Sequence, residues 1–481
     1  KWVTAVINVM IYGYLVIRIL MRIYVEKQAP RMNWPALGVW VVMMLGMIFS
    51  KNESVWPVWF LAMFGCFYLT EYTKEELDAL FNGMLNGIII GFCILQGFAT
   101  MYRAFDNLRY AGMYSNGNMY AVFCLIVHAA ILAKWYQFKQ KGSSPAWRVL
   151  AGLGSSTLAA YCFLSIGRTA IIVLCLNTVL LIALFFFQEK RKRLLKAAGR
   201  LIGVVLAVIL IFPVVFSSVR VIPAEFYSAM ILSGDAGNKI QGMVPLEDDR
   251  YIDMDEFLEE ALGRLFWFFQ PKDKEEPDIV GRIGRFLSPA LKVYAAEKIN
   301  EGDLALAEEP VAKKPWGSGL DQNDPVLTDA DEMVDPIKVR WAIYKTYLGR
   351  LNLWGHGNGE DGVWVTEDYF APHAHNVFLQ IMFSFGILTG VLFLGIVLAA
   401  LFHCLKRCFS GEQEGWFFIV GVFMITSFAG FGTLEVNWRL GQLTFTALFV
   451  VLYLLLHRCG QEDTKVEDEV SLSIRSRKGK R

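Results

Sequence analysis

The sequence predicts an all-α membrane protein that crosses the bilayer about 11–12 times and carries one large extracytoplasmic domain. Hydrophobic residues make up 55% of the 481 positions and charged residues only 19%. That is more apolar material than the core of a soluble domain requires. The apolar residues also gather in runs long enough for one helix to cross a bilayer. We therefore expect a polytopic protein of the cell membrane.

The candidate spans follow from these apolar runs. In chain order they cover residues 3–24, 36–50, 55–71, 81–101, 118–134, 148–165, 168–187, 201–218, 375–402, 415–431 and 440–457. The second and third are short for a membrane span, which needs about 20 residues. This division predicts transmembrane helices 1–8 in 1–218, an extracytoplasmic loop domain in 219–374 between the eighth and ninth helices, helices 9–11 in 375–457, and a charged cytoplasmic tail in 458–481.

Lysine and arginine in the short loops predict the orientation, because cytoplasmic loops carry an excess of them. The loop 188–200 is the most basic in the chain, and the basic residues of 134–148 and of 406–407 agree with the same alternation. The outer face then receives four segments, 101–118, 165–168, 219–374 and 431–439. The alternation also places Lys1 outside, so we expect at least one further helix before it.

Charge and cysteine usage exclude several classes of function. Carboxylates outnumber basic side chains about two to one across 219–374, which argues against a nucleic-acid partner. The eight cysteines lie in or beside apolar runs without metal-ligand spacing, so neither a zinc site nor a disulfide framework is expected. The acidic run 321–335 lacks the ligand order and central glycine of an EF-hand. No metal and no cofactor are predicted.

The most informative stretch runs from Arg340 to Gly390. Three of the six histidines, at 356, 373 and 375, lie in this polar, glycine-punctuated segment, which leads into an apolar run predicted to be an unbroken helix. Titratable side chains at the mouth of a membrane helix are typical of a reaction or binding site. The alternative is that His373 and His375 belong to an ordinary solvated loop. His128, on an apolar helix face, is predicted to be a hydrogen-bonded interior side chain.

Four sequence pieces resemble the superfamily of O-antigen ligases and O-antigen polymerases. They are Tyr110–Asn118, Phe163–Ala170, the pair Arg340–Trp341 with the following Trp354–Gly357, and His375–Asn376 followed by nine residues and Gly386. The last piece is the most specific one. Ile166 and Gly167 change the register of the second piece, and Trp341 follows Arg340 directly where the family has three residues between them. The resemblance covers about the C-terminal two-thirds of the chain.

The resemblance implies a glycosyltransferase that takes a polyprenyl-diphosphate-linked glycan as donor and an acceptor glycan or lipid as second substrate, on the outer side of the membrane. It implies that Arg168 and Arg340 bind the diphosphate, since arginine pairs phosphate oxygens bidentately. His375 is the implied catalytic base, because imidazole titrates near neutral pH. The implied substrate-binding residues are Asn376, His373, Trp341, Arg103, Arg109 and Arg439.

Other interpretations remain open at this point. A ligase and a polymerase of this kind differ only in the acceptor. From another class, the protein could be a secondary transporter or a lipid-linked sugar flippase, which predicts ionisable residues at mid-membrane that few of these helices carry. Arg168 could lie at the membrane interface with its charge in water, as could Arg103, Arg109 and Arg439. Trp341 could belong to an interfacial aromatic belt.

Overall fold

A computed structural model describes the protein at residues 2–27, 34–49, 72–103, 109–114, 117–188, 194–232, 336–356, 362–366, 369–410 and 416–433, and at positions 254, 257, 258, 261, 262, 448, 451, 452, 454 and 455. The described residues are mostly helical, as predicted. The predicted span 55–71, most of the outer domain 219–374 and Arg439 lie outside them.

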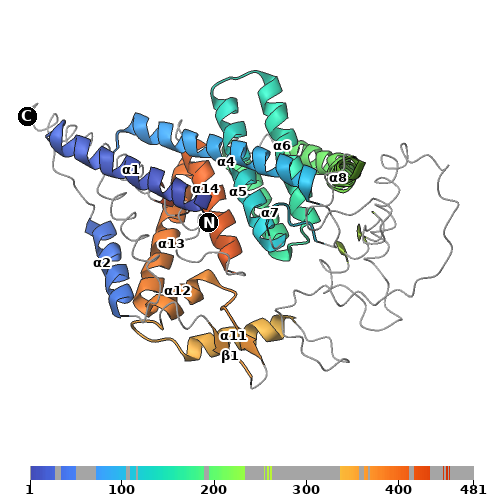
Figure 1. The fold of residues 1–481 in the computed structure, drawn as a ribbon. Coiled ribbons are helices and arrows are strands. Elements are labelled where there is room, and N and C mark those ends of the chain that lie inside the picture. The colour runs from blue at the N-terminus through green and yellow to red at the C-terminus, as the bar shows by residue number, and fades with distance from the viewer. Residues whose placement is uncertain are drawn as a thin grey trace, which may run out of the picture. The chain divides into compact units, whose positions relative to one another are not determined.

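The helices, coloured along the chain in Figure 1, are α1 (Trp2–Tyr24), α2 (Trp34–Phe49), α4 (Lys74–Tyr102), α5 (Gly117–Gln140), α6 (Pro145–Leu164), α7 (Arg168–Gln188), α8 (Leu194–Leu232), α11 (Pro336–Gly349), α12 (Val377–Phe385), α13 (Ile387–Ser410) and α14 (Trp416–Gly432). Among the described residues, four helical segments are long and apolar enough to cross a membrane: Lys74–Tyr102, Gly117–Lys139, Ile202–Pro223 and Ile387–Phe409. By length and composition, these helices are compatible with a membrane protein.

One small sheet departs from the all-α prediction. Strand β1 (Val363–Trp364) pairs antiparallel with β2 (Phe370–Ala371), with Val363 opposite Ala371. Both strands lie in the predicted outer segment, and Val363 and Ala371 are fully buried against α11 and α12. Two residues a strand are too few for an alternating pattern to be visible in the sequence.

The chain forms two compact units. The first comprises Lys1–Leu85 with Leu327–Arg481, and the second comprises Asn86–Val326. In the second unit α5 packs along α6, and α6 packs on α8. His128 of α5 is buried there and its Nε2 lies 2.8 Å from the Ser155 hydroxyl of α6. The interior role predicted for His128 is therefore confirmed.

In the first unit α13 packs against α2, α12 and α14. The close approach of α2 depends on Gly46, where a Cβ atom would lie 2.6 Å from the Phe385 carbonyl oxygen. A second core joins α11 to the small sheet and α12, and it is formed by Ile343, Tyr347, Val363, Ala371, Ala374, Leu379 and Phe383.

The predicted unbroken span 375–402 is wrong, because the helix breaks at Gly386. Gly386 has φ +93°, and a Cβ there would lie 2.0 Å from the Leu353 carbonyl oxygen. The segment 352–356 crosses at this point: the His356 N–H donates to Phe383 O (2.8 Å), and the Ile387 N–H donates to Asn352 O (3.1 Å). The crossing satisfies backbone groups that a helix end would otherwise leave unpaired. A glycine inside an apolar run does not reveal such a break, since membrane helices tolerate glycine.

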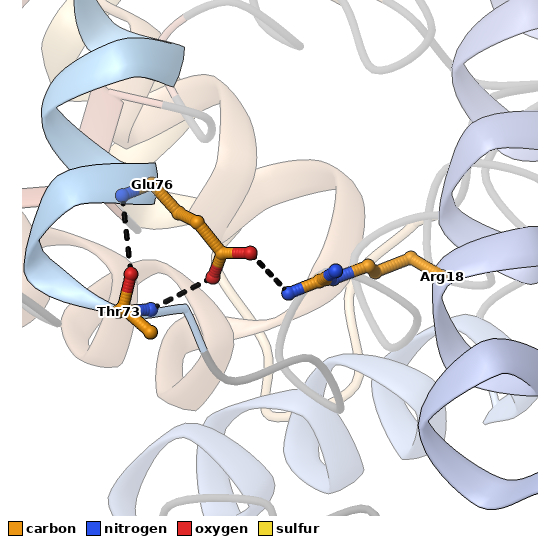
Figure 2. A network of polar contacts seen from close by, with 3 residues as sticks. All are labelled: Arg18, Thr73 and Glu76. Carbon is orange, nitrogen blue, oxygen red and sulfur yellow. Dashed lines mark hydrogen bonds and ion pairs between the residues drawn. The ribbon is translucent and has the colours of Figure 1, made fainter. Parts of the chain in front are cut away.

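Figure 2 shows how α4 begins. The Glu76 N–H donates to Thr73 Oγ1 (3.3 Å), and the Thr73 N–H donates to Glu76 Oε2 (2.9 Å). This reciprocal pair is a capping box. The other oxygen of Glu76 accepts a hydrogen bond from Arg18 Nη2 of α1 at 2.5 Å. The predicted alternation places the end of the first span and the start of the fourth on one face, and this ion pair is consistent with it.

The Arg18–Glu76 pair is expected to contribute little stability of its own. The two side chains are 23% and 38% exposed, so solvent screens their attraction. In a double-mutant cycle of Arg18→Ala and Glu76→Ala, thermal unfolding in detergent should give a coupling of no more than about 1 kcal/mol. A coupling of about 3 kcal/mol or more would show that the pair is shielded from solvent.

Candidate functional site

The predicted site residues fall into two groups, one in each compact unit. Arg103, Arg109 and Arg168 belong to the second unit. The first unit contains Arg340, Trp341, His373, His375 and Asn376. Each group is built by a different set of helices and loops.

In the second unit, two predicted outer loops lie together. Arg109 Nε donates to the Ser165 carbonyl oxygen (2.9 Å), and its Nη2 donates to Asn118 Oδ1. The Tyr110 N–H donates to Leu164 O (3.1 Å). The loop before α5 is thus fastened to the turn between α6 and α7. The prediction that 101–118 and 165–168 share one face agrees with these contacts.

Arg109 has a loop-holding role that was not predicted. Its guanidinium hydrogen-bonds a backbone carbonyl and an amide oxygen of the protein itself. Gly117 allows this packing, because a Cβ there would meet Ser165 O at 3.2 Å and Arg109 Nε at 3.4 Å. The predicted contact of Arg109 with substrate stays a prediction.

Arg168 follows a tight turn and is the first residue of α7. The turn contains Ile166 with φ +48°, a left-handed conformation that is uncommon for a β-branched residue. The Ser165 hydroxyl stabilises it by donating to Cys162 O (2.6 Å) and accepting from the Gly167 N–H (3.3 Å). The Arg168 side chain is exposed at a helix N-terminus, where the helix dipole favours anions. Arg103, also exposed, follows the end of α4.

A hydrogen-bonded cluster joins the loop before α5 to α4. Gln96 Nε2 donates to the Tyr110 hydroxyl (3.1 Å), while the Tyr120 hydroxyl donates to Gln96 Oε1 (2.6 Å). Burial raises the pKa of Tyr110 well above its ordinary value, and it raises the pKa of Tyr114 to about 12. Both phenols therefore keep their protons to a higher pH than an ordinary tyrosine. The sequence signal for this cluster is Gln96, a polar amide within the apolar stretch 87–99 of α4, and sequence reasoning missed it.

In the first unit, the two candidate histidines precede α12. The ring centres of His373 and His375 lie 4.3 Å apart. His375 has φ +47°, and its carbonyl oxygen accepts a hydrogen bond from the Tyr344 hydroxyl (3.1 Å). Left-handed backbone at a residue other than glycine persists only where surrounding contacts enforce it, and such residues cluster at functional sites. Both side chains are half-buried.

Asn376 caps α12. Its Oδ1 accepts from the Leu379 N–H (3.0 Å), and its Nδ2 donates to the carbonyl oxygen of Thr433 after α14 (3.1 Å). Both ends of the side chain thus bond the backbone of this unit. The sequence does contain a signal for this role, since asparagine before an apolar run is a typical helix N-cap. Substrate contact by Asn376 stays a prediction.

Helix α11 holds the histidine loop in place. The Tyr347 hydroxyl donates to Ala371 O (3.2 Å), one turn along from the bond of Tyr344 to His375. Arg340 lies one turn before Tyr344, on the same side of the helix. One helix face therefore carries Arg340 and both tyrosines that bind the histidine loop. Trp341 lies on a different face and is 67% exposed.

His356 has a structural role. Its ring stacks on Phe383 with the ring centres 4.3 Å apart, and its Nε2 lies 2.6 Å from the Arg350 carbonyl oxygen. It thereby fastens the crossing segment to α12. Within the described residues, no three His, Cys, Asp or Glu side chains gather as metal ligands.

No protein-family model, curated protein or solved structure matches the chain. The resemblance to the O-antigen ligase and polymerase superfamily therefore stands on the sequence motifs.

Proposed function

We propose that this protein is a membrane glycosyltransferase that moves an oligosaccharide from a polyprenyl diphosphate to an acceptor hydroxyl during surface polysaccharide assembly. The supporting observation is the face of α11, where Tyr344 binds the loop of His373 and His375 and Arg340 lies one turn away. Arg340 and the histidine loop therefore belong to one unit and are linked through α11. A cation for the leaving group and a base for the nucleophile are what this transfer requires.

In the proposed reaction the acceptor oxygen forms a bond to the anomeric carbon of the donor sugar. The bond between that carbon and the diphosphate oxygen breaks, and the polyprenyl diphosphate leaves with the electron pair. His375 takes the proton of the acceptor hydroxyl, a step for which imidazole is suited near neutral pH. Arg340 donates to the diphosphate oxygens and stabilises the charge that develops on them.

The start of α12 adds a second favourable field for the anion. Val377 is its first helical residue, two positions after His375. The positive end of the helix dipole therefore lies beside the histidines and favours negative charge there.

Arg340→Ala is expected to abolish the glycan product without changing the amount of protein in the membrane. The measurement is the gel profile of surface glycan in a complemented deletion strain, with initial rates in proteoliposomes that contain the lipid-linked donor. Lys345→Ala is the matched control, since this exposed cation lies on another face of α11. Arg168→Ala tests the predicted second phosphate ligand separately. Normal product from both arginine variants would refute the donor assignment.

The acceptor can be determined from the glycan of the deletion strain. Single repeat units attached to the acceptor would indicate a lost polymerase. Long lipid-linked chains that are not transferred would indicate a lost ligase. Unaltered glycan together with a lost solute flux would instead identify a transporter.

A further inference from the structure

Helix α11 has an outward face on the side away from the core that it shares with the small sheet. Its inner face packs Ile343 and Tyr347 into the core shared with the small sheet and α12. The outward face carries Trp341 and Leu348, which are 67% and 54% exposed. Seven residues are close to two helical turns, so these side chains lie on one stripe, with exposed Lys345 between them. Both are large apolar side chains that gain free energy when they leave water.

The charge of this segment is unlike that of its surroundings. Residues 336–350 contain Lys338, Arg340, Lys345 and Arg350 and no carboxylate, within a longer acidic segment. Tryptophan is enriched at the membrane–water interface, and lysine and arginine near that level extend their charged ends to the headgroups. Clustered basic residues attract anionic lipid headgroups.

A backbone hydrogen bond connects the segment after α11 to the start of α13. The Asn352 carbonyl oxygen accepts from the N–H of Ile387, the first residue of the candidate span Ile387–Phe409. Three residues after α11 the chain is therefore at the depth where α13 enters the bilayer.

Exposed apolar side chains surround this point. Leu353 and Trp354 are 56% and 47% exposed, and Leu388 of α13 is 48% exposed. The Trp354 ring also contacts Phe49 at the end of α2, with 4.8 Å between the ring centres. Exposed apolar side chains therefore lie both at the mouth of the span and, with Leu348, in the last turn of α11.

We propose that α11 lies flat in the headgroup region of the leaflet that α13 enters, with Trp341 and Leu348 toward the acyl chains and its cations among anionic lipid phosphates. The helix is about 21 Å long, and Trp341 and Leu348 are about 10 Å apart along its axis. An upright helix would place Trp341 about 10 Å farther from the bilayer than Leu348 and expose it to water. A flat helix gives both side chains the same depth.

This inference does not depend on the proposed reaction, because it rests on the exposure of Trp341 and Leu348, the charge of 336–350 and the bond between Asn352 and Ile387. It has one consequence for the site on the other face. It places Arg340 at the depth of lipid phosphates, whatever substrate it binds.

Spin-label depth measurements on the full chain test the orientation. Trp341→Cys, Leu348→Cys and Leu398→Cys are labelled in nanodiscs of phosphatidylglycerol and phosphatidylcholine, with labelled wild-type protein as the background. The relative accessibility to oxygen and to a nickel chelate gives the depth. We expect equal, shallow depths at 341 and 348 and a much greater depth at 398, near the middle of α13. Water-like nickel accessibility at 341 would overturn the proposal, and so would low accessibility of both labels to both reagents, which indicates a protein partner.

Photolabelling of the unmodified protein avoids any dependence on variants. Phosphatidylglycerol with a diazirine next to the glycerol ester should label residues 336–350. Lys345→Glu, which replaces one of the two lysines of this segment by a carboxylate, should lower that labelling several-fold. Lys406→Glu on α13 should not. Labelling at the start of α13 with none in 336–350 would show that α11 does not contact lipid.

Discussion

Gly386→Ala is expected to prevent normal folding of the first unit. The backbone at Gly386 has φ +93°, and the added Cβ would lie 2.0 Å from the Leu353 carbonyl oxygen. Backbone strain and overpacking together should cost at least about 3 kcal/mol. Loss on this scale is a large part of the stability of a typical domain. Size-exclusion profiles and thermal unfolding in detergent measure the effect.

Gly395→Ala is the matched control for this experiment. Gly395 lies in α13, and a Cβ at that position would have no atom within 4 Å. The alanine there should be neutral or slightly stabilising, because it favours the helix. If the two variants behave alike, the helix runs straight through position 386 and the crossing of 352–356 is absent.

His375→Asn should lower the transfer rate by about 10²–10⁴-fold while the protein stays folded. Asparagine tolerates left-handed backbone, so it keeps the φ of +47° and removes only the base. The Tyr344 bond is also retained, because it goes to the backbone carbonyl of residue 375. Initial rates at saturating donor, donor binding and thermal unfolding should be measured together.

His373→Asn is the comparison for the second imidazole. It should reduce the rate less, since His373 is predicted to bind substrate and its ring lies 4.3 Å from that of His375. A rate for His375→Asn within about threefold of wild type would refute its role as base. A variant that is already unfolded at the assay temperature would show that the lost rate reflects a structural role instead.

The helices were predicted well where the apolar run and the helix have the same ends. The predicted span 168–187 is α7, Arg168–Gln188, and the predicted 148–165 is α6, which begins after its Ser144 cap. The agreement fails for α8, Leu194–Leu232, which extends beyond the predicted 201–218 at both ends. An apolar run marks the part of a helix that lipid can accept. The helix continues through flanking segments that include charged residues such as Lys196, Arg220 and Glu225.

The candidate site was predicted only in part. Short loops made it possible to predict that 101–118 and 165–168 share a face, because the alternation of spans leaves few choices. The contacts that hold the site could not be predicted in this way. Tyr344 and Tyr347 reach residues 24 to 31 positions away, and Arg109 reaches Ser165 across 56 positions. Such pairings depend on tertiary packing, which periodicity in one sequence does not contain.

The crossing at Gly386 connects the end of α11 to the start of α13. Two backbone bonds, from Ile387 to Asn352 and from His356 to Phe383, join the segment after α11 to the junction of α12 and α13. The Tyr344 hydroxyl, bonded to the carbonyl oxygen of His375, continues this series of contacts. The start of α13, the end of α11 and the histidine loop are therefore joined by hydrogen bonds within one unit.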